Sequence, residues 1–90
     1  MPTYVIERDL PGAGSLTGDE LHAISAKSNG VLADMAGRAT WLHSYVTDDK
    51  IFCVYEADDV KAVKEHAEQG GFPCTAVHEL STTIDPSTGK

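Results

Sequence analysis

Three side chains in the middle and second half of the chain are of the types that bind transition-metal ions: His43, Glu56 and His66. His43 and Glu56 lie in two apolar runs joined by a short polar turn, which is typical of a β-hairpin, and His66 follows in a helical stretch. Two imidazoles and a carboxylate suit a borderline divalent ion such as nickel, zinc, copper or iron better than magnesium or calcium. Such a site requires that the fold bring the three side chains together.

The predicted hairpin decides which of these side chains share a face. Residues 41–46 and 51–56 are rich in aromatic and β-branched residues, and residues 47–50 supply polar turn formers. The pairs expected from a two-residue turn at Asp48 and Asp49 are Val46 with Ile51, His43 with Val54 and Trp41 with Glu56. Side chains alternate along a strand, so the first face carries Leu42, Ser44, Val46, Ile51, Cys53 and Tyr55, and the second carries Trp41, His43, Tyr45, Phe52, Val54 and Glu56.

We expect the second face, with His43 and Glu56, to be turned toward the helices. His66 lies beside the apolar stripe of a helix that runs back along the strand, and at ~1.5 Å per residue it reaches roughly the level of His43. Two interpretations then remain open. In the first, His43, Glu56 and His66 converge on a metal site, with Tyr4 or Glu7 nearby, depending on which side chains of the first strand point inward. In the second, which the spacing alone favours, both histidines are core residues satisfied by backbone carbonyls, and Glu56 is bonded near a helix terminus.

The order of the predicted elements indicates the fold. The elements are a strand at Tyr4–Arg8, a helix from a capping box at Thr17 and Glu20 to a stop at Gly37, the hairpin, a helix from Asp58 to Gly70-Gly71, and a strand at Thr75–Ile84. With right-handed crossovers, β-α-β-β-α-β gives a four-stranded antiparallel sheet with both helices on one face. We therefore predict an α+β protein with the ferredoxin-like plait.

The length of the chain and its bare sheet face bear on domains and partners. Ninety residues suit one domain with one core, so we expect residues 1–84 to form a single domain and residues 85–90 a flexible tail. The sheet face that the helices leave open needs a cover, and on a hairpin this apolar the simplest cover is a second copy of the protein. We expect a homodimer formed through the sheet face.

Composition excludes several classes of partner. The formal net charge is −7, with 14 acidic and 7 basic side chains in no basic cluster, which argues against nucleic-acid binding. No segment is long and apolar enough to span a membrane, and Cys53 and Cys74 lack the spacing of a thiolate zinc site. We expect a soluble, cytoplasmic protein with reduced thiols.

The two remaining histidines are not expected to bind a metal. His22 is expected on the solvated side of the first helix and His78 near the edge of the sheet.

Several stretches together resemble a known family. They are YVIERDLPG, LTGDEL, SNGVLADM, WLHSYVTDDKIFCVYEADD, KEHAEQGGFP and TTIDPSTG, and they cover nearly the whole chain. The chain resembles a family of short bacterial domains whose best-described type is a nickel-binding protein. The resemblance implies a ferredoxin-like homodimer that binds nickel for storage or buffering and is not an enzyme. His43, Glu56, His66 and Tyr4 all fall inside the matching stretches.

A second, weaker resemblance implies a different function. The strand that ends in VYE and the following helix with His66 are similar to the dimeric α+β barrel proteins, which include antibiotic-biosynthesis monooxygenases. There a helix histidine faces a pocket between sheet and helices. The rival interpretation is thus a small-molecule binder or enzyme that works in this pocket without a metal. No nucleophile–base pair is evident, so nickel binding ranks first, and a purely structural dimer is the third option.

Overall fold

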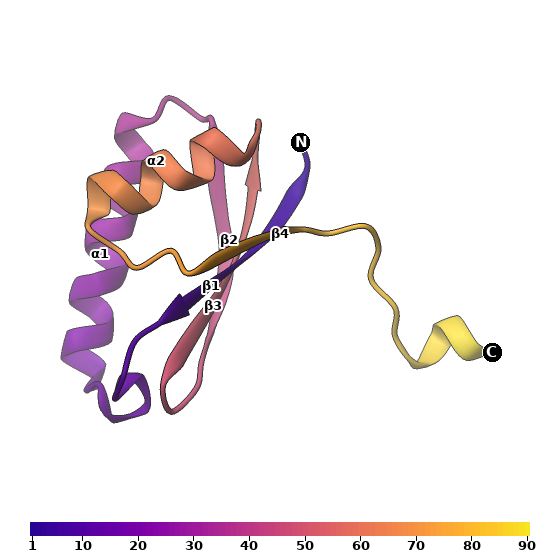
Figure 1. The fold of residues 1–90 in the computed structure, drawn as a ribbon, viewed down its shortest axis with the longest axis horizontal. Coiled ribbons are helices and arrows are strands. Elements are labelled where there is room, and N and C mark those ends of the chain that lie inside the picture. Colours follow the sequence, from indigo (N-terminus) through magenta and orange to yellow (C-terminus); the bar gives the residue numbers. More distant parts are fainter.

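The computed structural model describes residues 1–90, which form one unit of a β-sheet and two α-helices. Its main elements are β1 (Thr3–Asp9), α1 (Gly18–Asp34), β2 (Ala39–Val46), β3 (Lys50–Ala57), α2 (Val60–Gly70) and β4 (Ala76–Glu79). The sheet order is β2-β3-β1-β4, and every neighbouring pair is antiparallel. Both helices lie on the same side of the sheet and leave its other side bare (Figure 1). The predicted α+β, ferredoxin-like fold is confirmed.

Helix α1 begins where its capping signal indicates. The hydroxyl of Thr17 accepts a hydrogen bond from the backbone N–H of Glu20 at 3.2 Å, and the Glu20 carboxylate accepts one from the N–H of Thr17 at 3.0 Å. Two of the backbone donors at the helix start are thereby satisfied. One side of the helix is turned inward, and none of the residues along it is exposed: Leu21, Ile24, Ser28, Val31, Leu32 and Met35.

Helix α2 is capped one residue later than predicted. Asp59, not Asp58, is the N-cap, and its carboxylate accepts a hydrogen bond from the N–H of Ala62 at 2.9 Å. Asp58 instead uses its backbone N–H to reach the carbonyl of Arg38. The helix ends at Gly70, and the capping residue Gly71 has a φ of 69°, the left-handed conformation that glycine adopts at low cost.

Strand β4 is shorter than the predicted Thr75–Ile84. Its ladder with β1 ends at Glu79, and the N–H of Leu80 makes one more hydrogen bond to the carbonyl of Thr3, at the first residue of β1. Beyond that point no strand is present to pair with, so residues 81–84 carry no ladder. The C-terminal segment leads away from the body of the domain and ends in a single 3-10 turn, Pro86–Gly89, capped by Asp85 (Figure 1).

The core lies between the two helices and one face of the sheet. β1 turns Tyr4, Ile6 and Arg8 to this side, and all three are buried. β3 contributes Ile51, Cys53, Tyr55 and Ala57. Three polar or charged residues are buried with these apolar side chains: Arg8, Ser28 and His66. Buried polar groups need partners, so the surroundings of these three residues are where a functional site is to be sought.

The observed cap of α2 can be tested with a pair of neighbouring variants. We expect Asp59→Ala to lower the free energy of unfolding by about 1 kcal/mol, because the N–H of Ala62 loses its acceptor. Asp58→Ala should change it far less, since Asp58 takes part through its backbone alone. Urea unfolding followed by circular dichroism measures both. A larger loss in Asp58→Ala would contradict this assignment of the cap.

Candidate functional site

A β-bulge in β2 changes which hairpin residues share a face. Val46 pairs with Ile51 and His43 with Val54, as predicted. Trp41, however, pairs with Tyr55 and not with Glu56, because the register shifts between Trp41 and His43. An extra residue in one strand moves everything beyond it to the opposite face. Trp41 therefore joins Tyr55 on the side of the helices, where its indole N–H donates to the hydroxyl of Ser44 at 2.9 Å.

His43 and Glu56 lie together on the open face of the sheet. Their predicted shared face is confirmed: Glu56 pairs with Thr40, and His43 pairs two residues away along β3 with Val54. The expectation that this face is turned toward the helices is wrong. The buried residues of β3 have the opposite parity, and the open face also carries Glu7, whose carboxylate would need a partner if it were covered.

His66 lies on the other side of the sheet, in the core. Its side chain is only 1% exposed, and its Nε2 lies 3.1 Å from the hydroxyl of Ser28. The rings of Tyr55 and Phe72 flank it at centroid distances of 5.1 and 5.5 Å. Burial, and secondly the positive charge of Arg8, hold the pKa of His66 below its usual value. This is a neutral core histidine, and its partner is a side-chain hydroxyl in place of the expected carbonyl.

The two candidates on β1 are separated by the same alternation. Tyr4 points to the helices, and burial raises the pKa of its hydroxyl, with the nearby charge of Glu79 adding to the effect. A phenol that holds its proton is a poor metal ligand at neutral pH. Glu7 points to the open face, where its carboxylate is 2.7 Å from the ammonium group of Lys50. The sequence left open which of the two residues points inward, and the structure shows that Tyr4 does and Glu7 does not.

The four predicted ligands therefore do not form one site within a single chain. His43 and Glu56 stand on the open face, and His66 and Tyr4 stand beneath the helices, so the predicted convergence is wrong. No group of three or more histidine, cysteine, aspartate or glutamate side chains in the chain is arranged to hold a metal ion. Whether any of the four residues binds a metal with the help of a second chain stays a prediction.

The open face carries a second histidine that the sequence did not mark as a ligand. The cross-strand row through the middle of the sheet reads His43, Val54, Val5 and His78. At ~4.8 Å per strand spacing, the two histidines are about 14 Å apart, too far to share an ion in one chain. His43 is exposed, and its ring meets that of Tyr45 edge-on at 5.1 Å.

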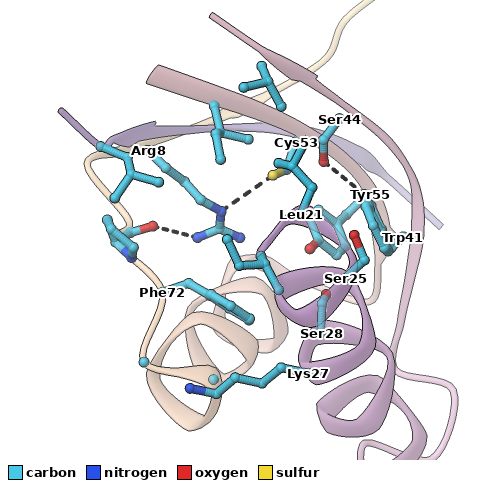
Figure 2. Close-up of a pocket in the computed structure, with 17 residues that line it drawn as sticks. Arg8, Leu21, Ser25, Lys27, Ser28, Trp41, Ser44, Cys53, Tyr55 and Phe72 are labelled. Carbon is cyan, nitrogen blue, oxygen red and sulfur yellow. Dashed lines mark hydrogen bonds between the residues drawn. The ribbon is translucent and has the colours of Figure 1, made fainter. Parts of the chain in front are cut away.

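A cavity of about 320 Å³ lies on the opposite side, between the sheet, α1 and the end of α2 (Figure 2). Its lining is mostly apolar and consists of Arg8, Leu10, Leu21, Ile24, Ser25, Lys27, Ser28, Trp41, Ser44, Val46, Ile51, Cys53, Tyr55, Gly70, Gly71, Phe72 and Pro73. Burial raises the pKa of Tyr55, so its hydroxyl stays protonated at neutral pH. None of the predicted metal ligands lines this cavity.

Arg8 is the residue of this cavity that sequence reasoning missed. Its Nε–H donates to the sulfur of Cys53 at 3.4 Å, and its Nη1 donates to the carbonyl of Pro73 (Figure 2). The guanidinium carbon lies 5.6 Å from the centre of the Phe72 ring. The signal was present in the alternation of Tyr4, Ile6 and Arg8, which places the arginine on the same face as two core residues.

Fold and site together define a small ferredoxin-like α+β domain with a bare, histidine-bearing sheet face. The family model for the nickel-responsive SCO4226-like proteins matches residues 4–80, so the chain belongs to this family. The family suggested by the sequence motifs is thereby confirmed.

The solved structure of SCO4226 from Streptomyces coelicolor A3(2) has the same fold. It superposes with a TM-score of 0.76 over 91% of this chain and 99% of that chain, at 19% sequence identity. No curated protein matches the chain in sequence. None of the helices has the length and apolar character needed to cross a bilayer.

The surroundings of His66 predict a pH dependence of stability. Its pKa is lower in the folded state than in the unfolded chain, where it lies near ~6.5. As pH falls through the unfolded value, the unfolded chain therefore takes up a proton that the folded state does not, and the free energy of unfolding decreases. We expect His66→Gln to reduce this loss between pH 7.5 and 5.5 and the exposed-site control His22→Gln to keep it. Urea unfolding at the two pH values measures the effect, and an unchanged loss in His66→Gln would contradict it.

Proposed function

We propose that the protein binds nickel as a homodimer and serves as a small cytoplasmic store or buffer of the metal. The observation that carries this proposal is the match of residues 4–80 to a family described as nickel-responsive. The proposal does not include an enzymatic activity. Zinc, copper and iron are the competing ions, because the same imidazole and carboxylate donors suit all four.

The ligands that we propose are His43 and Glu56 on the open face. His43 is exposed, and Glu56 is its diagonal neighbour on the adjacent strand, at a Cα separation of about 7 Å that long side chains can bridge. One chain supplies too few donors at this place for a specific site. A second copy packed face to face would double them, so the ion is held between two protomers. His78, from the same cross-strand row, is the further donor that a partner could present.

The open face also has the apolar character of an interface. Tyr45 is 60% exposed, and Phe52, Val54 and Val5 are only half-covered in the single chain. Exposed apolar patches of this kind commonly mark association surfaces. Covering them with a second copy would remove apolar area from water and would bring the two sets of donors together in one event.

His66 and Tyr4 keep a ligand role only as an untested prediction. Both are buried beneath the helices, and the imidazole of His66 already has the Ser28 hydroxyl as a partner. They therefore serve as the internal comparison for the open-face residues. A site that depends on His66 requires the helices to move, whereas a site that depends on His43 does not.

The metal ligands can be identified by calorimetry with nickel and zinc on three histidine variants. We expect His43→Ala to weaken nickel binding at least tenfold, which corresponds to ~1.4 kcal/mol. His22→Ala, on the exposed side of α1, should bind like the wild type. His66→Ala should keep nickel affinity as long as circular dichroism shows that it is folded. Normal binding by His43→Ala with lost binding by His66→Ala would show that the ion lies in the core.

The pH dependence of nickel affinity tests the chemistry of the ligands. Because the imidazole must lose its proton to bind, affinity should fall as pH drops through ~6.5. Calorimetry at pH 7.5 and 5.5 measures the change. An affinity that is the same at both values would assign the binding to the many surface carboxylates.

The dimer is tested by light scattering at micromolar concentration. We expect a mass of twice 9.6 kDa for the wild type and of one chain for Val54→Asp, which places a charge at the centre of the open face. Asn29→Asp adds the same charge on the exposed surface of α1 and should remain dimeric. A wild type that scatters as a single chain would rule out the dimer.

A further inference from the structure

We propose that the cavity between the sheet and the helices binds a small organic monocarboxylate with an apolar body, whose carboxylate pairs with Arg8. This site lies on the opposite side of the sheet from the proposed nickel ligands and does not depend on them.

Arg8 is a buried charge without a counter-charge. It is 5% exposed, and the ion pairs of the structure involve Arg38 and Lys50 but not Arg8. Removing a guanidinium from water is unfavourable unless an anion and hydrogen bonds compensate the lost hydration. The carboxylates that adjoin it in β1, Glu7 and Asp9, are both held by Lys50.

The hydrogen bonds of Arg8 leave one side of the guanidinium free. Nε and Nη1 reach a thiol sulfur and a backbone carbonyl, which are neutral acceptors. Nη2 is buried and has no partner at all. In Figure 2 the Arg8 side chain extends from the sheet into the space above Phe72 that the lining residues enclose. Because Arg8 lines the cavity, an acceptor placed there would approach a guanidinium whose hydrogen bonds within the chain are incomplete.

The charges around the cavity are all positive. The chain has 14 acidic side chains, yet none of them is among the 17 residues that line the cavity. Its only charged lining residues are Arg8 and Lys27, and the ammonium group of Lys27 lies 5.7 Å from the centre of the Phe72 ring. In an otherwise acidic protein this pocket selects anions, because a cation would meet two like charges and no counter-charge.

The walls restrict the anion to one with an apolar body. Nine of the lining residues are hydrophobic, and a volume of about 320 Å³ is at the lower end of small-molecule sites. Free phosphate carries up to two charges on an oxygen-covered surface, and it would bury those oxygens against Leu21, Ile24 and Phe72. A carboxylate needs one guanidinium for its charge, and its hydrocarbon part matches the walls. The site thus fits short fatty acids and arylalkanoic acids as a class.

The single tryptophan provides the readout, because Trp41 lines the cavity. We expect octanoate to change the fluorescence of Trp41 saturably and to raise the melting temperature of the full-length protein. 1-Octanol has the same length without the charge and should bind at least tenfold more weakly. Inorganic phosphate should not compete. Equal binding of 1-octanol, or displacement of octanoate by millimolar phosphate, would overturn the proposal.

Variants then assign the binding to Arg8. Arg8→Met should lose at least tenfold in octanoate affinity and should bind octanoate and 1-octanol alike. Arg38→Met removes an exposed arginine that pairs with Glu65 and should bind like the wild type, as should His43→Ala on the open face. Unchanged octanoate affinity in Arg8→Met would overturn the proposal. If Arg8→Met does not fold, the comparison of octanoate with 1-octanol on the wild type decides alone.

Discussion

Two helices can cover only one face of a four-stranded sheet, and the strand alternation decides what each face receives. β1 and β3 turn Tyr4, Ile6, Cys53 and Tyr55 under the helices. The alternate residues of these two strands point to the open side. Glu56 of β3 and His43 of β2 lie there among apolar neighbours. The protein consequently has two chemically distinct regions, an open sheet face that carries imidazole and carboxylate groups and a cationic cavity beneath the helices, separated by the thickness of the sheet.

The enclosed side is organised by electrostatics as much as by packing. The charge of Arg8 acts on both neighbouring titratable groups, since it helps to keep His66 neutral and opposes the effect of burial on Tyr55. Neither of them supplies the negative charge that the guanidinium lacks. The core thus has a polar centre that is only partly satisfied, and the cavity beside it is where a ligand can complete it.

The fold was predictable from the sequence because its signals are local. The capping box at Thr17, the glycine stop at Gly71 and the hairpin register at Val46 and Ile51 each act over a few residues, and the structure has all three. The end of β4 was not predictable in this way, because it depends on where β1 begins to offer a pairing edge.

The site was harder to predict because it depends on which face the helices cover. The hairpin alternation placed His43 and Glu56 together correctly, but both of its faces are apolar enough to be buried. The carboxylates of Glu7 and Glu56 were the signal that this face points away from the helices. The bulge at Leu42 leaves no mark in the hydrophobic pattern, so the position of Trp41 in the cavity could not be read from the sequence.

Nuclear magnetic resonance can show directly whether nickel binds on the open face. Nickel is titrated into ¹⁵N-labelled protein, and the backbone amide signals are followed residue by residue. We expect the signals of His43, Val54 and Glu56 to shift or broaden first, while those of Ser28 and His66 in the two helices change last. Early loss of the Ser28 and His66 signals with an unperturbed His43 signal would place the ion beneath the helices instead.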